Sequence, residues 1–122
     1  MNRWIDVCGV DDLQPDSGVC AQVAGHQVAM FHLPKLDAVY SLDNFDPIAQ
    51  ANVLSRGMVG DLGGEPMVAS PMYKQHYNLK TGVCFEDASV RLTTYRLRIA
   101  DHRVWLQVDE HGVPVAMPIA TP

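Results

Sequence analysis

The sequence predicts an all-β domain with the architecture of an antiparallel β-sandwich. Short segments of alternating apolar and polar residues recur at a spacing of roughly ten residues, and turns rich in Gly, Pro, Asn and Asp separate them. The clearest alternation runs from Leu92 to Ile99, and the turn Asp101-His102 leads from it into Arg103–Val108. This pair is the strongest hairpin prediction in the chain. Only Gln50 to Leu54 has a helical pattern, and it extends over a turn or two.

The other strands follow from the same alternation, taken in chain order. Four are predicted in the amino-terminal part, at residues 4–8, 18–24, 27–33 and 38–42. The turns between the last three are expected at Gly25-His26 and at Pro34 to Asp37. Further along, Tyr77 to Leu79 and Val83 to Phe85 flank the turn Lys80-Thr81-Gly82, and we expect them to form a short pair.

The longest stretch without strand alternation runs from Asp43 to Gly82 and is rich in Gly, Pro, Asn, Asp and Met. Long irregular segments on a small β scaffold usually carry the function of the domain. From Asp109 onward, three prolines and the lack of periodicity predict an exposed tail that lies along the surface or is held by a partner. We therefore expect one domain over residues 1–108, with a tip subdomain at about 43–82, and a tail over 109–122.

Composition and charge exclude several functions. A chain of 122 residues can bury a sizeable core without disulfides or metal. Its formal net charge of −5 argues against nucleic-acid binding, which needs basic patches. The amino terminus lacks the pattern of a signal peptide, and no apolar segment approaches the length of a membrane span. Cys8, Cys20 and Cys84 form no CxxC motif and are expected to be reduced thiols, so we expect a cytoplasmic location.

None of the common catalytic motifs is present. Ser70 lacks the two glycines of a nucleophile elbow, and the glycines between residues 57 and 64 fit neither of the spacings that bind phosphates. No histidine stands at a zinc or iron–sulfur spacing from a cysteine. The sequence therefore predicts no self-contained active site and no catalytic residue.

One combination of segments resembles a known family, the Rieske [2Fe–2S] ferredoxin domain. It consists of Ser70 to Tyr73, the turn at residues 80–82 with the strand before it, and the hairpin at residues 95–108. In that family two loops, CxH and CPxH, each give one Cys and one His to the cluster. The resemblance implies a Rieske-like antiparallel sandwich whose irregular segment is similar to a cluster-binding tip.

All four cluster ligands are absent from the corresponding positions. Asn44 and Asp46 fall at the first pair, and Ser70 and Tyr73 fall at the second, with Pro71 retained between them. Iron–sulfur clusters of this class need two thiolates and two imidazoles, whereas these side chains offer oxygen or amide donors that suit hard ions. The resemblance therefore implies a lost cluster and no metal site. The alternative is a residual metal site that uses Asn44, Asp46, Tyr73 and His76.

Three longer segments are very similar to the small subunit of assimilatory NAD(P)H-dependent nitrite reductase, and they span Val53 to Asp61, Val68 to Leu79 and Thr81 to Asp87. This similarity implies an accessory chain of nitrate assimilation that binds a large subunit and holds no cofactor itself. In that family the large subunit carries FAD, sirohaem and an iron–sulfur cluster, and it reduces nitrite to ammonium.

The resemblance makes the irregular segment a docking surface rather than an electron-transfer tip. Its apolar and basic residues are the candidates for contact with the partner: Arg56, Met58, Met72, Lys74, Gln75 and His76. Ordinary core packing is the alternative for each methionine. A structural adaptor domain is the alternative for the chain as a whole.

Overall fold

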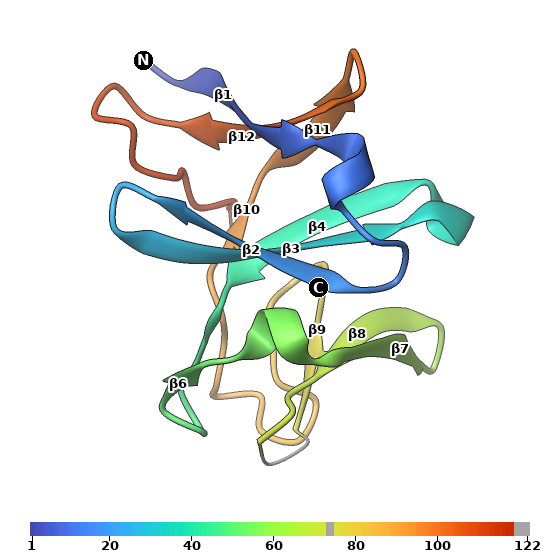
Figure 1. Cartoon of the computed structure of the whole chain (residues 1–122). Coiled ribbons are helices and arrows are strands. Elements are labelled where there is room, and N and C mark those ends of the chain that lie inside the picture. The colour runs from blue at the N-terminus through green and yellow to red at the C-terminus, as the bar shows by residue number, and fades with distance from the viewer. Residues whose placement is uncertain (73–74, 119–122) are drawn as a thin grey trace.

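Two antiparallel sheets and a smaller tip subdomain form three layers (Figure 1). The computed structural model describes residues 1–72 and 75–118. The first sheet has the strand order β1-β12-β11, with β1 at Arg3–Gly9, β11 at Leu97–Ala100 and β12 at Arg103–Val108. The second has the order β10-β4-β3-β2, with β2 at Gly18–Val23, β3 at His26–Leu33, β4 at Ala38–Asp43 and β10 at Thr94–Tyr95. The predicted all-β antiparallel fold is confirmed.

The tip subdomain contains short strands where the sequence predicted an irregular segment. A two-stranded sheet pairs β5 (Phe45–Asp46) with β6 (Ala51–Asn52). A three-stranded sheet has the order β7-β8-β9, at Met58–Leu62, Glu65–Ala69 and His76–Asn78. Strands β5 to β8 are only two to five residues long, and β7 and β8 contain Gly or Pro, so their alternation is too short to recognise. Strand β9 overlaps the strand predicted from Tyr77 to Leu79.

The helical turn predicted at Gln50 to Leu54 is wrong. The structure has strand β6 there, followed by a 3-10 turn, η3, at Leu54–Arg56. Gln50 has a φ of +57°, a left-handed conformation that an α-helix does not contain. Two further 3-10 turns, η1 at Val10–Asp12 and η2 at Pro34–Leu36, connect strands. In the described residues no helix is long and apolar enough to cross a membrane.

Strand β3 is the centre of the core because it is buried on both faces. Val28 and Met30 face the β1-β12-β11 sheet and pack with Val104 and its neighbours on β12. Ala29 and Phe31 face the tip and pack in a second apolar cluster. A strand between two layers loses the polar half of its alternation. The tip is therefore fixed to the sandwich through the same strand that holds the two sheets together.

One sequence-predicted turn and one strand differ in detail from the structure. The β2–β3 hairpin turns at Ala24-Gly25, with φ values of +50° and +79°, one residue earlier than predicted. The Asp101-His102 turn is confirmed, with φ values of +55° and +60°. The strand predicted from Leu92 to Ile99 is divided at Arg96, because β10 pairs with β4 in one sheet and β11 pairs with β12 in the other.

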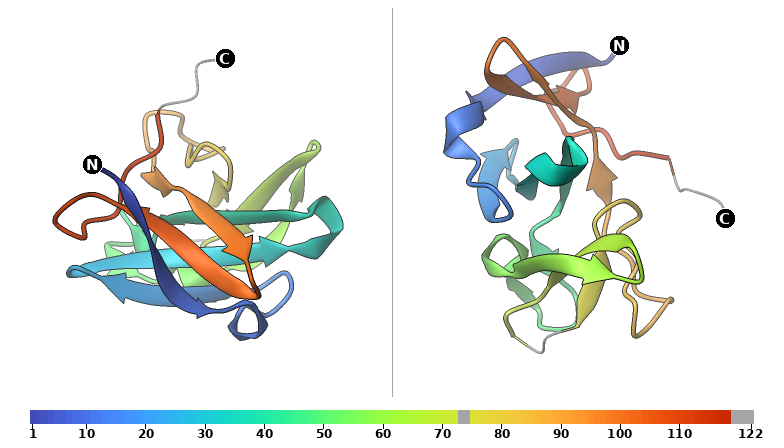
Figure 2. Two further views of the ribbon diagram at one scale, coloured as in Figure 1. Left: turned by 90° about the horizontal axis from the view of Figure 1, so that it is seen from above. Right: turned by 90° about the vertical axis from the view of Figure 1, so that its right-hand side faces the viewer.

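The segment after β12 runs back along the domain (Figure 2). The Val115 amide donates to the Gln107 carbonyl at 3.1 Å, and the Met117 amide donates to the Thr94 carbonyl at 2.7 Å. Pro114 is buried. Residues 113–117 thus lie along the surface of the sandwich, with Ala116 and Met117 exposed, which is one of the two arrangements that the sequence left open.

Gly18 is required where β2 passes the η3 turn of the tip. A Cβ added at Gly18 would lie 2.4 Å from the Ser55 backbone oxygen and 2.7 Å from a ring carbon of Phe31. We predict that Gly18→Ala lowers the free energy of unfolding by about 1–3 kcal/mol, measured by urea denaturation.

Gly9→Ala is the matched control for this substitution. A Cβ there would meet only the ends of the Arg103 and Asp12 side chains, at 3.3 and 3.4 Å. Its cost should stay below about 1 kcal/mol. Equal losses for Gly18→Ala and Gly9→Ala would contradict close packing between sandwich and tip.

Candidate functional site

A buried carboxylate joins the two loops that form the tip. Asp46 is 0% exposed. Its side chain accepts hydrogen bonds from the Ser70 hydroxyl at 2.5 Å, the Gln75 amide nitrogen at 2.5 Å and the Tyr77 hydroxyl at 2.6 Å. The three donors stand 24 to 31 residues away in the sequence. Asp46 therefore connects the loop after β4 to the segment between β8 and β9.

The backbone of the first loop also turns around this carboxylate. The Ile48 and Ala49 amides donate to Asp46 Oδ1 at 3.0 and 3.3 Å. The Gln50 amide donates to the Asp46 carbonyl at 2.7 Å. A buried carboxylate is tolerated only when its oxygens are hydrogen-bonded, and five donors meet that condition here.

Tyr77 is the third side chain that donates a hydrogen bond to Asp46. It is 0% exposed and stands on β9, within the tip subdomain. Burial raises the pKa of the Tyr77 hydroxyl, and its hydrogen bond to the Asp46 carboxylate raises it further. The phenol thus stays protonated at any ordinary pH.

Asn44 has a different role from Asp46. Its side-chain nitrogen donates to Gln27 Oε1 at 3.0 Å and lies 3.5 Å from Cys20 Sγ. Its oxygen accepts from the Ser55 amide at 2.7 Å. Asn44 thus ties the tip to the β2–β3 hairpin. Of the predicted ligand positions, the structure joins Asp46 and Ser70, and Tyr73 lies outside the described residues.

Two of the candidate interface residues share one face of the tip sheet. Met58 on β7 and His76 on β9 both pair in register with Ala69 on β8, so their side chains project from the same side. Met58 is 78% exposed, and Met72, in the turn after β8, is 51% exposed. Both methionines are therefore surface residues rather than core residues. Arg56, at the end of η3, is also exposed.

A glutamate fixes the orientation of His76. Glu86 Oε2 lies 2.7 Å from His76 Nδ1, and Glu86 Oε1 accepts from the His76 amide at 2.7 Å. Burial disfavours the ionised form of Glu86, but the His76 backbone and ring outweigh it, so the pKa of Glu86 is lowered.

Gln75 is not on the surface. It is 6% exposed and its amide belongs to the Asp46 cluster, which corrects its assignment as a contact residue. Lys74 lies outside the described residues. The sequence reasoning missed Phe45, Ile48 and Phe85, which are 43%, 39% and 40% exposed. Their only sequence signal is an apolar residue in a turn-rich segment.

Exposed apolar side chains gather on the tip. Of the nine large hydrophobic residues that are exposed in the described part of the chain, four belong to this subdomain, and a fifth, Phe85, is held beside it by the bond of its amide to the His76 carbonyl. We define the tip surface as these five residues together with Arg56 and His76. The five are Phe45, Ile48, Met58, Met72 and Phe85. An apolar surface with polar residues beside it is typical of a protein–protein contact.

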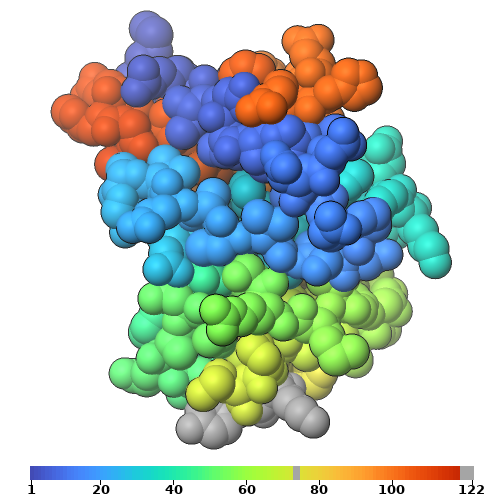
Figure 3. All heavy atoms as spheres, in the orientation of Figure 1, coloured from blue at the N-terminus to red at the C-terminus, as the bar shows by residue number. Residues whose placement is uncertain are grey.

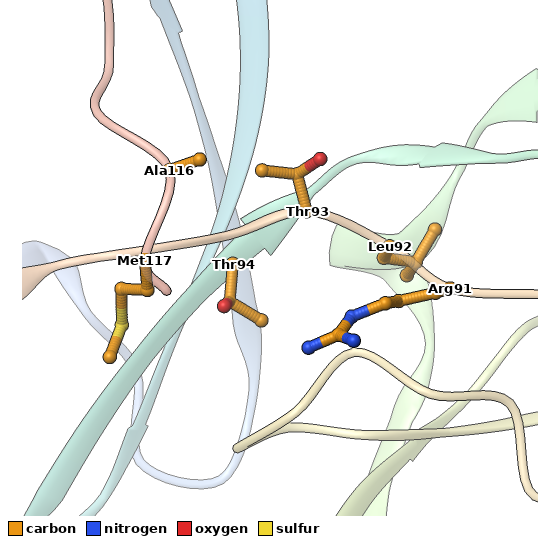
Figure 4. A pocket seen from close by; sticks show the side chains of 6 residues that line it. All are labelled: Arg91, Leu92, Thr93, Thr94, Ala116 and Met117. Atoms are coloured by element: carbon orange, nitrogen blue, oxygen red, sulfur yellow. The ribbon is translucent and has the colours of Figure 1, made fainter. Parts of the chain in front are cut away.

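The surface of the described residues has several open hollows. One of about 220 Å³ lies where Ala116 and Met117 pass Arg91 to Thr94 (Figure 4). Thr93 and Thr94 leave opposite sides of their segment, and the Arg91 guanidinium extends along the Thr94 side. In the part of the chain that is described, no three Cys, His, Asp or Glu side chains are placed to bind a metal ion.

Comparisons with known proteins agree with this geometry. Residues 3–107 match the family described as the Rieske-like [2Fe-2S] domain. The nitrite reductase (NADH) small subunit of Escherichia coli strain K12 is 40% identical over 107 residues, covering 88% of this chain and 99% of that protein. The NMR structure of the E. coli protein NirD is similar with a TM-score of 0.81 at 40% identity, over 88% of this chain and 98% of that one.

A large-subunit sequence contains a related segment. The NAD(P)H nitrite reductase large subunit of Klebsiella oxytoca is 37% identical over 103 residues, which are 84% of this chain and 11% of that protein.

The two sheets and the tip define this chain as a Rieske-like domain. Within that class, the chain belongs to the family of NAD(P)H-dependent nitrite reductase small subunits. The resemblance inferred from the sequence is confirmed.

The residues at the tip do not fit the [2Fe-2S] cluster that the name of the domain family implies. At two of the predicted ligand positions, the Ser70 hydroxyl donates to the Asp46 carboxylate at 2.5 Å. Hard oxygen donors replace the thiolate and imidazole donors that such a cluster requires. The Asp46 carboxylate is already engaged by five protein donors.

We predict that Asp46→Ala destabilises the chain strongly. It leaves the hydroxyls of Ser70 and Tyr77 and the Gln75 amide buried without their acceptor, so the free energy of unfolding should fall by about 2–4 kcal/mol. Asp46→Asn keeps the shape of the side chain but places a second NH₂ group against the donors. Its loss of unfolding free energy should therefore be intermediate.

Asp11→Ala, at an exposed aspartate in the η1 turn, is the control and should cost no more than about 0.5 kcal/mol. Denaturant unfolding measures all three variants. If Asp46→Ala were as mild as Asp11→Ala, the buried cluster would not hold the tip together.

The His76–Glu86 pair predicts a pH dependence in the acid range. Because the pKa of Glu86 is lowered from its ordinary value of 4.5, the pair stabilises the fold above that value and loses its effect as the pH falls below it. In a comparison of stability between pH 7 and pH 3, Glu86→Gln should lose less than the unsubstituted chain. If the stability of the two chains changed with pH in the same way, the His76–Glu86 pair would contribute nothing to the stability.

Proposed function

We propose that this chain is an accessory subunit of NAD(P)H-dependent nitrite reductase that binds the large subunit and carries no redox centre itself. The observation that carries the proposal is the buried hydrogen bond between Asp46 and Ser70, at two positions where a Rieske domain has cluster ligands. The chain then contributes to the reduction of nitrite to ammonium through binding alone. FAD, sirohaem and an iron–sulfur cluster belong to the large subunit in this family.

Electron transfer through a protein domain needs a redox centre. A hydrogen-bonded carboxylate, hydroxyl and phenol accept and release no electrons at the potentials of such an enzyme, and the raised pKa of Tyr77 keeps its phenol protonated. What the Asp46 cluster supplies is a fixed shape for two loops. A rigid loop surface loses little conformational entropy on binding, which favours a docking role.

The tip surface supplies the contact in this proposal. Its exposed side chains Met58 and Met72 are flexible and apolar, and His76 is oriented by Glu86. Arg56 adds a positive charge that suits an acidic group of the partner. The related segment within the Klebsiella large-subunit sequence supports a domain that works beside that subunit. Location in the cytoplasm stays a prediction from the sequence.

Metal analysis tests the absence of a redox centre. We predict that the chain, purified with its large subunit and then separated from it, contains no iron or zinc and has no visible absorption. Stoichiometric iron with a Rieske-type spectrum would overturn the cofactor-free role. A colourless protein with one equivalent of zinc would favour the residual metal site instead.

Substitution at the tip tests the docking role. We predict that Met72→Glu weakens co-purification with the large subunit at least tenfold, because it places a charge where an apolar side chain is buried in the complex. Met117→Glu, at a methionine that is 37% exposed beside β10, is the control and should have little effect.

Charge reversal gives a second test of the same surface. The double variant Arg56→Glu, Lys74→Glu should weaken binding to the large subunit more than Met72→Glu does when binding is measured in low salt. A complex that forms normally with Met72→Glu and with the charge reversals would place the contact elsewhere on the chain.

A further inference from the structure

Two of the exposed side chains on the tip surface are thioethers. Met58, the first residue of β7, is 78% exposed, and Met72, in the turn after β8, is 51% exposed. Strand β7 is an outer strand of the tip sheet, whose order is β7-β8-β9. Solvent and small reagents therefore reach both side chains in the free chain.

A thioether is oxidised at sulfur without first being ionised. Hydrogen peroxide transfers one oxygen atom to the sulfur: the thioether loses two electrons and becomes a sulfoxide, and the peroxide is reduced to water. The product is a polar side chain in place of a flexible apolar one. The reaction needs access to the sulfur, and the exposure of Met58 and Met72 provides it.

The cysteine thiols differ in this respect, because the thiolate is their reactive form. Burial raises the pKa of the Cys8 and Cys84 thiols. Cys20 is an exposed residue, but desolvation of its sulfur raises the pKa of its thiol as well. At pH 6 all three thiols are protonated, whereas the oxidation of a thioether does not depend on ionisation. Treatment with peroxide at pH 6 therefore favours the methionines.

The place of each methionine decides what its oxidation does. Met30 on β3 is 1% exposed and packs between the two sheets, so a sulfoxide there would be buried in the core and would destabilise the fold. Met58 and Met72 already contact water, so a sulfoxide at either costs the folded chain little. In a complex that buries them against an apolar surface, the sulfoxide loses its hydrogen bonds to water. Oxidation at the tip thus acts on docking and not on folding.

We propose that Met58 and Met72 are oxidation sites that control docking: a peroxide converts them to sulfoxides in the free chain, and the sulfoxide form binds the large subunit weakly. This inference rests on the proposed function, because it takes the tip surface as the contact. Docking covers the two thioethers, so the oxidised form arises from the free chain. Methionine sulfoxide reductases reverse the change: two thiols are oxidised to a disulfide, and the sulfoxide becomes a thioether and water.

The test oxidises the free chain with hydrogen peroxide at pH 6 until peptide mass spectrometry shows sulfoxides at Met58 and Met72. Binding to the large subunit is then measured at pH 7. We expect about a tenfold loss of affinity, because each docked sulfoxide is buried without a partner. Treatment with the reductases should restore the affinity. The urea midpoint of unfolding should stay unchanged, since Met30 remains reduced.

The double variant Met58→Leu, Met72→Leu removes both sulfur atoms and keeps apolar side chains. Whatever its affinity before treatment, peroxide should change that affinity less than twofold. Met117→Leu, at an exposed methionine outside the tip surface, is the matched control and should lose as much affinity on treatment as the unsubstituted chain.

Met1 measures the dose of peroxide in every chain, because it is 101% exposed. The amino terminus lies at the end of the molecule away from the tip (Figure 1). Figure 3 shows the same separation between the dark blue atoms of β1 and the green and yellow atoms of the tip. Oxidation of Met1 therefore leaves the tip surface unchanged.

The outcomes separate this inference from the proposed function. If the sulfoxide form binds with unchanged affinity while Met58 and Met72 are protected from peroxide within the complex, the inference is overturned and docking through the tip stands. If the two methionines are oxidised equally fast in the free chain and in the complex, the tip is not the contact, and both fail. A loss of affinity that persists in the double leucine variant and disappears in Cys20→Ser would assign the response to a thiol, and would also overturn the inference.

Discussion

The tip of this domain depends on one buried carboxylate. Asp46 receives hydrogen bonds from two loops that are far apart in the sequence, and it has no contact with solvent. Removing an ionised carboxylate from water is costly, and only a full set of donors offsets the cost. The hydroxyls of Ser70 and Tyr77 and the Gln75 amide are therefore constrained by the same requirement. In the described residues, hydrogen bonds to Asp46 connect the two loops.

Under the proposed function, the shape of the fold is kept without its redox chemistry. The sandwich, the tip sheet and the meeting of the two loops are those of a Rieske-like domain. At the predicted ligand positions Asp46 and Ser70, a carboxylate accepts a hydrogen bond from a hydroxyl. A surface held in this way is suited to binding, and the exposed methionines and the oriented His76 surround it.

The sequence predicted the sandwich well because most of its strands alternate clearly. It failed where short strands meet, as at Gln50, whose left-handed φ no pattern indicated. Asp46 and Ser70 were identified by their positions in a family scheme, but the hydrogen bond between them is a tertiary contact that periodicity does not report. The burial of Gln75 was missed for the same reason. Phe45 was missed because an apolar residue in a turn has no partner in sequence to mark it.

Native-state amide hydrogen exchange tests most directly whether hydrogen bonds, rather than a metal, hold the tip. The informative amides are those of Ile48, which donates to the Asp46 side chain, and Ser70, which donates to the Gln75 carbonyl at 2.8 Å. Their protection should be the same before and after exhaustive treatment of the chain with chelators. A selective loss of protection at these two amides after chelation would show that a metal connects the loops, and would contradict the account.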